Sequence, residues 1–183
     1  MKDNIKIISV LTLTCIVCAF SLAFVNSLAK EKIVTEKKNK IEDAISILSP
    51  DAKDIQAFSA GGETIYKLFN SKQVLIGYAF LAQGNGYQGV ITMMVAMDAK
   101  LEKLQGIEII ESVETPGLGA KINEVSFNGQ FKNLNAQVAI ECVKEEAKQD
   151  NQIKAISSAT ISSKAVVNIL NEKIKSIRSA LTK

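Results

Sequence analysis

The sequence predicts an α+β protein in which a single N-terminal transmembrane helix precedes one domain, an antiparallel sheet flanked by helices. Three patterns lead to this prediction. An uncharged apolar run lies near the amino terminus, short strand-like runs separated by turn residues follow it, and a helical repeat of apolar residues comes last. The 183 residues leave room for one globular domain besides the membrane segment.

The composition excludes several kinds of chemistry. The formal net charge is only +3 and the one arginine is Arg178, whereas nucleic-acid binding usually needs clustered arginines on a basic patch. We therefore expect no nucleic-acid partner. The chain has no histidine, which excludes His-based zinc sites, haem ligation and Ser-His-Asp triads. Because catalytic side chains are scarce, a bound cofactor is favoured as the source of any chemistry.

Residues 7–25, "IISVLTLTCIVCAFSLAFV", carry no charge and match the about 20 residues that cross a hydrocarbon core. A cleaved signal peptide is the alternative, because Ser27-Leu28-Ala29 resembles a cleavage site. Signal peptides usually have an apolar part of only about 7–15 residues, so we favour a retained anchor that contacts lipid. The expected divisions are a cytoplasmic tip and anchor at residues 1–28, a juxtamembrane linker helix at 29–50 and the folded domain at 51–183.

The cysteines do not indicate a redox or metal site. Cys15 and Cys18 have the C-x-x-C spacing, but both lie inside the apolar run, where the small cysteine side chain packs well. This context favours packing over a redox pair. Cys142 stands in the strand-like stretch "VAIECV" and is expected in the core.

The charges that flank the span leave its orientation open. Lys2 and Lys6 precede it, and five lysines follow it between residues 30 and 40. The positive-inside rule taken alone would place the domain in the cytoplasm, but long domains cross membranes regardless of flanking charge. Charge by itself does not decide the side.

Strand-like runs dominate the first half of the domain. After a helical repeat that ends at Ser49-Pro50, apolar and β-branched residues alternate with turns rich in Gly, Asn, Asp and Lys. Several runs are apolar on both faces, which indicates a sheet covered by helices on one side and by chain or ligand on the other. The expected strands are residues 64–69, 74–82, 90–97 and 106–112.

A loop, a short helix, a strand over "AQVAIECV" and a final helix are expected in the second half. The final helix is indicated by apolar residues that recur at helical spacing, with positive residues near its carboxyl end, where they suit the helix dipole. Its apolar face comprises Ala165, Val166, Ile169, Leu170, Ile174, Ile177 and Leu181.

Five hydroxyl residues stand at the start of that final helix. In "ISSATISSKAVVN" they are Ser157, Ser158, Thr160, Ser162 and Ser163. One or two hydroxyls are ordinary helix caps. A helix amino terminus with free N–H groups and nearby hydroxyls also suits a phosphate. The residues alone leave capping and phosphate binding as alternatives.

The stretch "ETPGLG" is the second candidate binding loop. Pro116, Gly117 and Gly119 would fix a tight turn and let backbone approach a flat ligand, and Glu114 and Thr115 would add polar groups for the edge of a heterocycle. The alternative is an ordinary turn between a strand and a helix. Alone, this loop does not distinguish the two.

Taken together, the two loops resemble a known family. "ETPGLGAKI" and "ISSATISSKAVVN" are similar to the paired motifs of the FMN-binding domain in the G subunit of the Rnf ion-translocating electron transport complex and in the C subunit of the sodium-pumping NADH:quinone reductase. "GYQGVITMMVAMD" resembles that family's glycine-rich entry to a central strand. The resemblance implies FMN joined through its phosphate to Thr160. It implies further cofactor contacts from Ser158, Ala159, Ile161, Ser162, Glu114, Thr115, Gly117, Leu118 and Gly119.

One residue departs from the family pattern. Ser158 stands where the family usually has glycine, and a position that requires a positive φ angle would strain a serine. The hydroxyl residues around it still fit the pattern. Thr160 therefore remains the expected attachment site.

The resemblance also implies a function and a location. It implies an FMN-carrying electron-transfer subunit of an Rnf-type ferredoxin:NAD complex, a redox subunit rather than an enzyme on its own, whose flavin domain lies outside the cytoplasm in the cell membrane. Its partners would be the other membrane subunits and a flavin transferase. The alternatives are a component similar to the C subunit of the quinone reductase and a membrane-anchored binding or assembly module without redox chemistry. The short chain favours the Rnf type.

Overall fold

The computed structural model describes residues 2–181, which fall into two compact units that divide after Lys40. Met1 and residues 182–183, which belong to the predicted tip and the predicted domain, lie outside the described residues. Helix α1 (Lys2–Leu48) belongs to both units. The second unit begins at Ile41, inside the linker helix expected over residues 29–50.

The first unit consists of the amino-terminal part of α1. Among the described residues, α1 is the single helix long and apolar enough to cross a membrane. The hydroxyls of Thr12, Thr14 and Ser21 donate hydrogen bonds of 2.8–2.9 Å to the carbonyl four residues earlier. Polar side chains satisfied within their own helix suit a lipid environment. Cys15 and Cys18 are free thiols on the surface of this helix.

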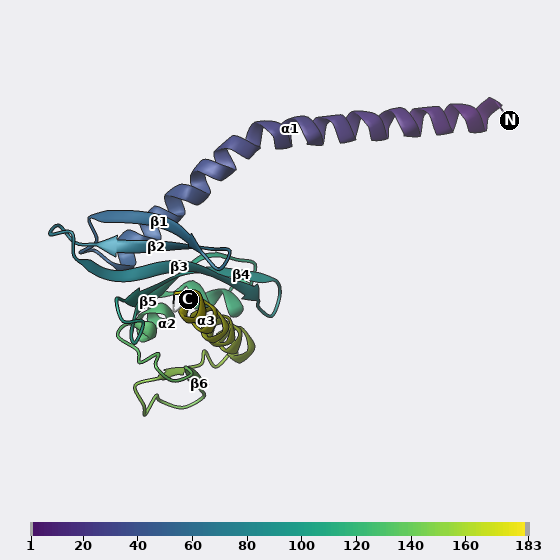
Figure 1. Ribbon diagram of the computed structural model, residues 1–183. Coiled ribbons are helices and arrows are strands. Elements are labelled where there is room, and N and C mark those ends of the chain that lie inside the picture. Colours follow the sequence, from purple (N-terminus) through teal and green to yellow (C-terminus); the bar gives the residue numbers. More distant parts are fainter. Residues whose placement is uncertain (1, 182–183) are drawn as a thin grey trace. The chain divides into compact units, whose positions relative to one another are not determined.

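The second unit is built on a five-stranded antiparallel sheet in the order β1-β2-β3-β4-β5 (Figure 1). The predicted antiparallel sheet is thereby confirmed, and the four expected strands correspond to β2–β5. Strand β1 was not expected, because it is a largely exposed edge strand without a regular apolar alternation. The strands are β1 (Asp54–Ala60), β2 (Glu63–Phe69), β3 (Leu75–Asn85), β4 (Val90–Asp98) and β5 (Leu104–Ser112).

Both faces of this sheet are buried. Pairing aligns Phe80 with Val95 and Val95 with Ile107, so that these side chains share the face covered by the second half of the chain. Met94 and Ala96 point to the opposite face, because successive residues of a strand alternate between faces. The two-sided apolar character seen in the sequence therefore reflects two separate cores.

The carboxyl end of α1 covers one of these faces. Ala44 and Ile45 are almost fully buried against β2, β3 and β4, with Leu68, Ala79 and Met94 among their neighbours. Directly after the helix, the Ser49 hydroxyl donates a hydrogen bond to the Gln105 side chain on β5, and the Gln105 amide donates to the Ile76 carbonyl at 3.1 Å. The helix end is thereby attached to the sheet by apolar and polar contacts.

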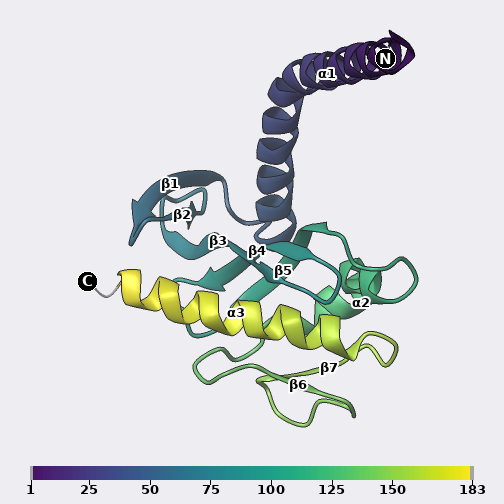
Figure 2. The same ribbon diagram turned by 90° about the vertical axis from the view of Figure 1, so that its right-hand side faces the viewer.

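Helix α3 (Thr160–Leu181) lies across the other face of the sheet (Figure 2). Its buried residues include Val166, Ile169, Leu170, Ile174 and Ile177, as the helical repeat predicted. The other elements of this layer are the 3-10 helix η1 (Gly119–Asn123), the short helix α2 (Val125–Asn128) and the 3-10 helix η2 (Gly129–Phe131).

A small two-stranded parallel sheet, β6 (Glu141–Val143) with β7 (Gln152–Lys154), completes this layer. The strand expected over "AQVAIECV" is therefore shorter than expected, and β7 was not expected. Cys142 on β6 is half-buried against the core. Burial raises the pKa of the Cys142 thiol and the nearby Lys164 ammonium partly opposes this shift. At neutral pH the thiol stays protonated, as suits a packing residue.

We predict that Ile45→Ala lowers the free energy of unfolding by about 2–5 kcal/mol, because it removes a buried side chain and leaves a cavity. Ile45 is 1% exposed, whereas its near neighbour Ile47 is 63% exposed. Ile47→Ala is the matched control and should change stability by less than about 0.5 kcal/mol. Urea unfolding of the full chain in detergent, followed by tyrosine fluorescence, measures both. Equal losses in the two variants would contradict the packing of α1 on the sheet.

Candidate functional site

The centre of the candidate site is the carboxylate of Glu114, which joins three segments of the chain. Glu114 follows β5 and is only 5% exposed. Its Oε1 accepts hydrogen bonds from the backbone N–H groups of Tyr87 at 2.7 Å and Gln88 at 3.0 Å. Its Oε2 accepts a hydrogen bond of 2.7 Å from the Ser162 hydroxyl. The carboxylate thus links the β3–β4 turn, the loop after β5 and the first turn of α3.

Glycines allow the chain to pass close to this carboxylate. A Cβ atom at Gly86 would collide with Oε1, and one at Gly119 would collide with Oε2 and stand 2.8 Å from the Ser162 Oγ. Gly117 is required for a different reason, because it has a φ angle of +76° and open space around it. The two glycines of "ETPGLG" therefore have separate roles, close packing at Gly119 and turn geometry at Gly117.

A second contact fixes the loop to the β3–β4 turn. The Thr115 hydroxyl donates a hydrogen bond of 2.7 Å to the Gln88 side-chain oxygen. The turn itself is closed by a 2.7 Å hydrogen bond from the Gly86 N–H to the Gly89 carbonyl. The loop of residues 114–119 and the turn of residues 86–89 therefore form one unit, although 24 or more residues separate them along the chain.

The five hydroxyls before and within α3 divide into two groups. Ser162 and Ser163 are buried and hydrogen-bonded within the protein. The Ser163 hydroxyl donates to the Ala159 carbonyl at 3.0 Å and accepts from the Ile156 N–H at 3.1 Å. These two hydroxyls hold the helix start in place. Hydrogen bonds within the protein at the helix start therefore account for two of the five hydroxyls.

The remaining three hydroxyls are available for a ligand. Ser157 and Ser158 lie on an exposed turn, and Thr160 is the half-buried first residue of α3. Within residues 2–181, no hydrogen bond joins any of these three hydroxyls to another group. Ser158 does not have a positive φ angle, so serine in place of the family's usual glycine causes no backbone strain.

Free backbone donors accompany these hydroxyls. The first helical hydrogen bond of α3 runs from the Ser163 N–H to the Ala159 carbonyl at 3.0 Å. The N–H groups of Thr160, Ile161 and Ser162 precede that bond and therefore have no partner within the helix. Such donors and the helix dipole both favour an anion at this end.

Exposed apolar side chains are sequence neighbours of the residues that approach the carboxylate. Leu118, next to Gly119, is 48% exposed, and Ile161, next to Ser162, is 61% exposed. Tyr87 and Val113 are also largely exposed. Sequence reasoning had not identified these last two, because an isolated exposed aromatic or valine has no recognisable pattern. A flat, partly apolar ligand would find complementary surface here.

Comparisons with known proteins agree with this geometry. Residues 86–175 match the model of the FMN-binding domain family, and this range contains the β3–β4 turn, the loop after β5 and the start of α3. The fold is similar to that of NqrC from Shewanella oneidensis, with a TM-score of 0.57, 17% sequence identity and coverage of 68% of this chain and 66% of that one. The chain thus contains an FMN-binding domain with an NqrC-like fold.

Relatives of similar length show to which family of FMN-binding proteins the chain belongs. The chain is 31% identical over 180 residues to the G subunit of the proton-translocating ferredoxin:NAD(+) oxidoreductase complex of Clostridium ljungdahlii, covering 96% of this chain and 94% of that protein. It is 28% identical to the G subunit of the ion-translocating oxidoreductase complex of Methanosarcina acetivorans, covering 94% of each. The protein belongs to the family of G subunits of Rnf-type ion-translocating oxidoreductase complexes.

We predict that Ser162→Ala lowers the free energy of unfolding by about 1.5–3 kcal/mol, because it removes a hydrogen bond to a buried charged group. Ser158→Ala is the matched control, since Ser158 is exposed and its hydroxyl has no partner among the described residues. It should change stability by less than about 0.5 kcal/mol. Urea unfolding compares the two, and similar values would show that the Ser162 bond to Glu114 contributes little.

Proposed function

We propose that this chain carries FMN as an electron-transfer subunit of an Rnf-type membrane complex and holds the flavin covalently through a phosphoester to Thr160. The observation that supports it most is the position of Thr160 at the first residue of α3, beside unpaired backbone donors and with a free hydroxyl. The neighbouring buried hydroxyls of Ser162 and Ser163 are already engaged. Thr160 is therefore the hydroxyl best placed for a phosphate.

The residues of the site fit the two parts of FMN. Its phosphate would lie at the start of α3, near Ser158 and Ala159 and against the N–H groups of Ile161 and Ser162. Its flat ring would lie against the turn of "ETPGLG", where Thr115, Leu118 and Gly119 offer backbone and apolar surface. Bound FMN supplies the redox chemistry. The chain positions the cofactor.

The protein would act within a larger membrane assembly. Its relatives are named as components of oxidoreductase complexes, and we propose that this chain likewise passes electrons between neighbouring subunits on a path between ferredoxin and NAD. The match to G subunits along nearly the whole chain supports this assignment over the quinone reductase, whose C subunit in Vibrio anguillarum matches 45% of this chain. Residues 7–25 would span the cell membrane and the flavin domain would lie outside the cytoplasm. A flavin transferase would attach the cofactor.

We predict that Thr160→Ala abolishes covalent flavin, because no other unpartnered hydroxyl stands at the first residue of the helix. Intact-mass measurement after denaturation should show the mass of FMN on the native chain, made together with a flavin transferase, and not on the variant. Ser157→Ala is the control and should retain the flavin. Peptide mapping that places the flavin on Ser157 or Ser158, or a flavin peptide that persists in Thr160→Ala, would overturn the assignment.

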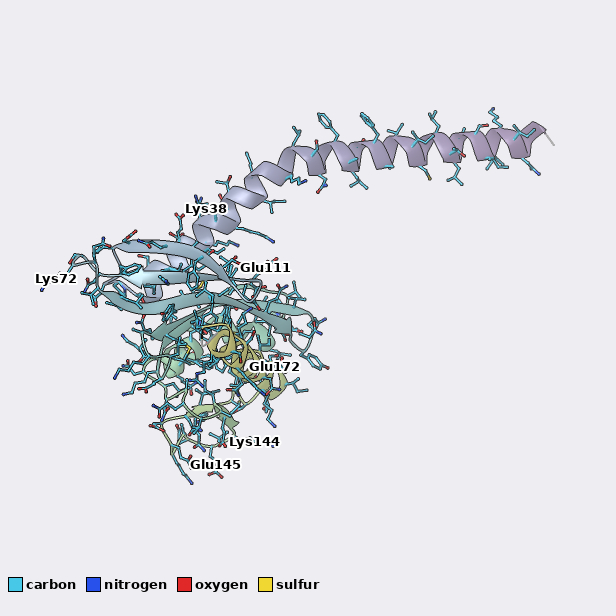
Figure 3. The ribbon with its side chains drawn as sticks, viewed as in Figure 1. Lys38, Lys72, Glu111, Lys144, Glu145 and Glu172 are labelled. Carbon is cyan, nitrogen blue, oxygen red and sulfur yellow. The ribbon has the colours of Figure 1, made fainter. Side chains whose placement is uncertain are left out.

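We predict that trypsin added to spheroplasts cuts the domain while the membrane is intact. The loop between β6 and β7 offers exposed cleavage sites, and Figure 3 shows Lys144 and Glu145 of this loop extending away from the sheet. Replacing Lys144 and Lys148 by glutamine should suppress cleavage in this loop, which identifies the site. Cleavage that requires disruption of the membrane would place the domain in the cytoplasm instead.

A further inference from the structure

We propose that Glu114 is the positioning residue of the flavin site, and this inference rests on the proposed attachment of FMN at Thr160. Its carboxylate would hold the helix turn that carries the phosphate at a fixed distance from the loop and turn that face the ring. The residue types of "ETPGLG" predict that Glu114 meets the edge of a heterocycle. Its hydrogen bonds to the protein favour a positioning role instead.

The hydrogen bonds of the carboxylate support this assignment. Both oxygens are engaged by protein donors, Oε1 by the N–H groups of Tyr87 and Gln88 and Oε2 by the Ser162 hydroxyl. An ionised carboxylate only accepts hydrogen bonds, so it matches three converging donors. The residue is 5% exposed, which leaves little of it to contact a ligand.

The partners of the carboxylate explain why its role is positional. Ser162 lies two residues after Thr160, in the same first turn of α3. The chain just before this turn, Ser157 and Ser158, is exposed and makes no side-chain hydrogen bonds with the described residues. Among the described residues, the Ser162 bond to Glu114 joins the hydrogen bonds of the Ser163 hydroxyl in fixing the helix start through side chains. The other carboxylate oxygen of Glu114, Oε1, fixes the β3–β4 turn.

The charge of Glu114 has a consequence of its own. Within the part of the chain that the structure describes, no lysine or arginine forms an ion pair with this carboxylate. A buried negative charge without a cation opposes the arrival of further negative charge nearby. The carboxylate should therefore lower the midpoint potential of a flavin held at this site, which packing alone would not do.

Three variants separate geometry from charge. Glu114→Ala removes both. Glu114→Gln keeps the shape, because its oxygen can accept from the two N–H groups while its NH₂ donates to the Ser162 hydroxyl, which can also accept. Glu172→Gln is the matched control, since Glu172 is exposed on the same helix as Thr160 (Figure 3).

The first measurement uses full-length protein made without a flavin transferase. In Glu114→Ala, hydrogen exchange at the Tyr87 and Gln88 amides should become at least about tenfold faster relative to the control, equivalent to ~1.4 kcal/mol. In Glu114→Gln these amides should stay closer to native protection. If Glu114→Ala does not fold, Ser162→Ala is used in its place, because it breaks only the bond between Glu114 and α3. Hydrogen exchange is then measured at the amides of the first turn of α3. Native exchange rates in every variant would overturn the proposal.

The second measurement uses full-length protein made with the transferase. Glu114→Ala should lower the fraction of chains with covalent flavin several-fold, whereas Glu114→Gln should load flavin and raise its midpoint potential relative to Glu172→Gln. Native loading in Glu114→Ala, or an unchanged potential in Glu114→Gln, would overturn the proposal. If even the native chain carries no covalent flavin, the proposed function fails, and the exchange measurement still decides the positioning role.

Discussion

The arrangement of the candidate site depends on one buried carboxylate. Neither the β3–β4 turn nor the loop after β5 is a regular element, and the first turn of α3 has few helical hydrogen bonds of its own. Glu114 accepts hydrogen bonds from two of these segments and belongs to the third. Because an unsatisfied buried charge is costly, the three donors must remain in place together. These hydrogen bonds join the two irregular segments and the helix turn into one connected unit.

The sheet supplies the frame that brings those segments together. In a meander with the order β1-β2-β3-β4-β5, the β3–β4 turn and the end of β5 reach the same edge of the sheet, because β4 runs antiparallel to both of its neighbours. Helix α3 crosses the face of the sheet that the second half of the chain covers. Its amino terminus lies at the same edge as the β3–β4 turn and the end of β5. The site is therefore built at the ends of elements, while their buried middles provide rigidity.

Periodic features of the molecule could be predicted from the sequence, and the contacts of the site could not. The apolar run, strands β2–β5 and helix α3 each repeat a pattern that reports burial of one or both faces. Edge strand β1 and the short strand β7 bury too little to leave such a pattern. The motifs identified Glu114 and the hydroxyls as candidates, but Glu114 and Ser162 are 48 positions apart along the chain. No local pattern shows that Ser162 holds a carboxylate while Thr160 stays free.

The burial of Ala44 and Ile45 against the sheet has a practical consequence for work with an isolated domain. Removing the amino-terminal helix at the end of its helical pattern, just before Pro50, would uncover the sheet face formed by Leu68, Ala79 and Met94. A recombinant fragment that begins at this point would expose a contiguous apolar surface and tend to self-associate during purification. A water-soluble form of this protein should therefore start upstream of Ile41, so that it retains the last two turns of the helix.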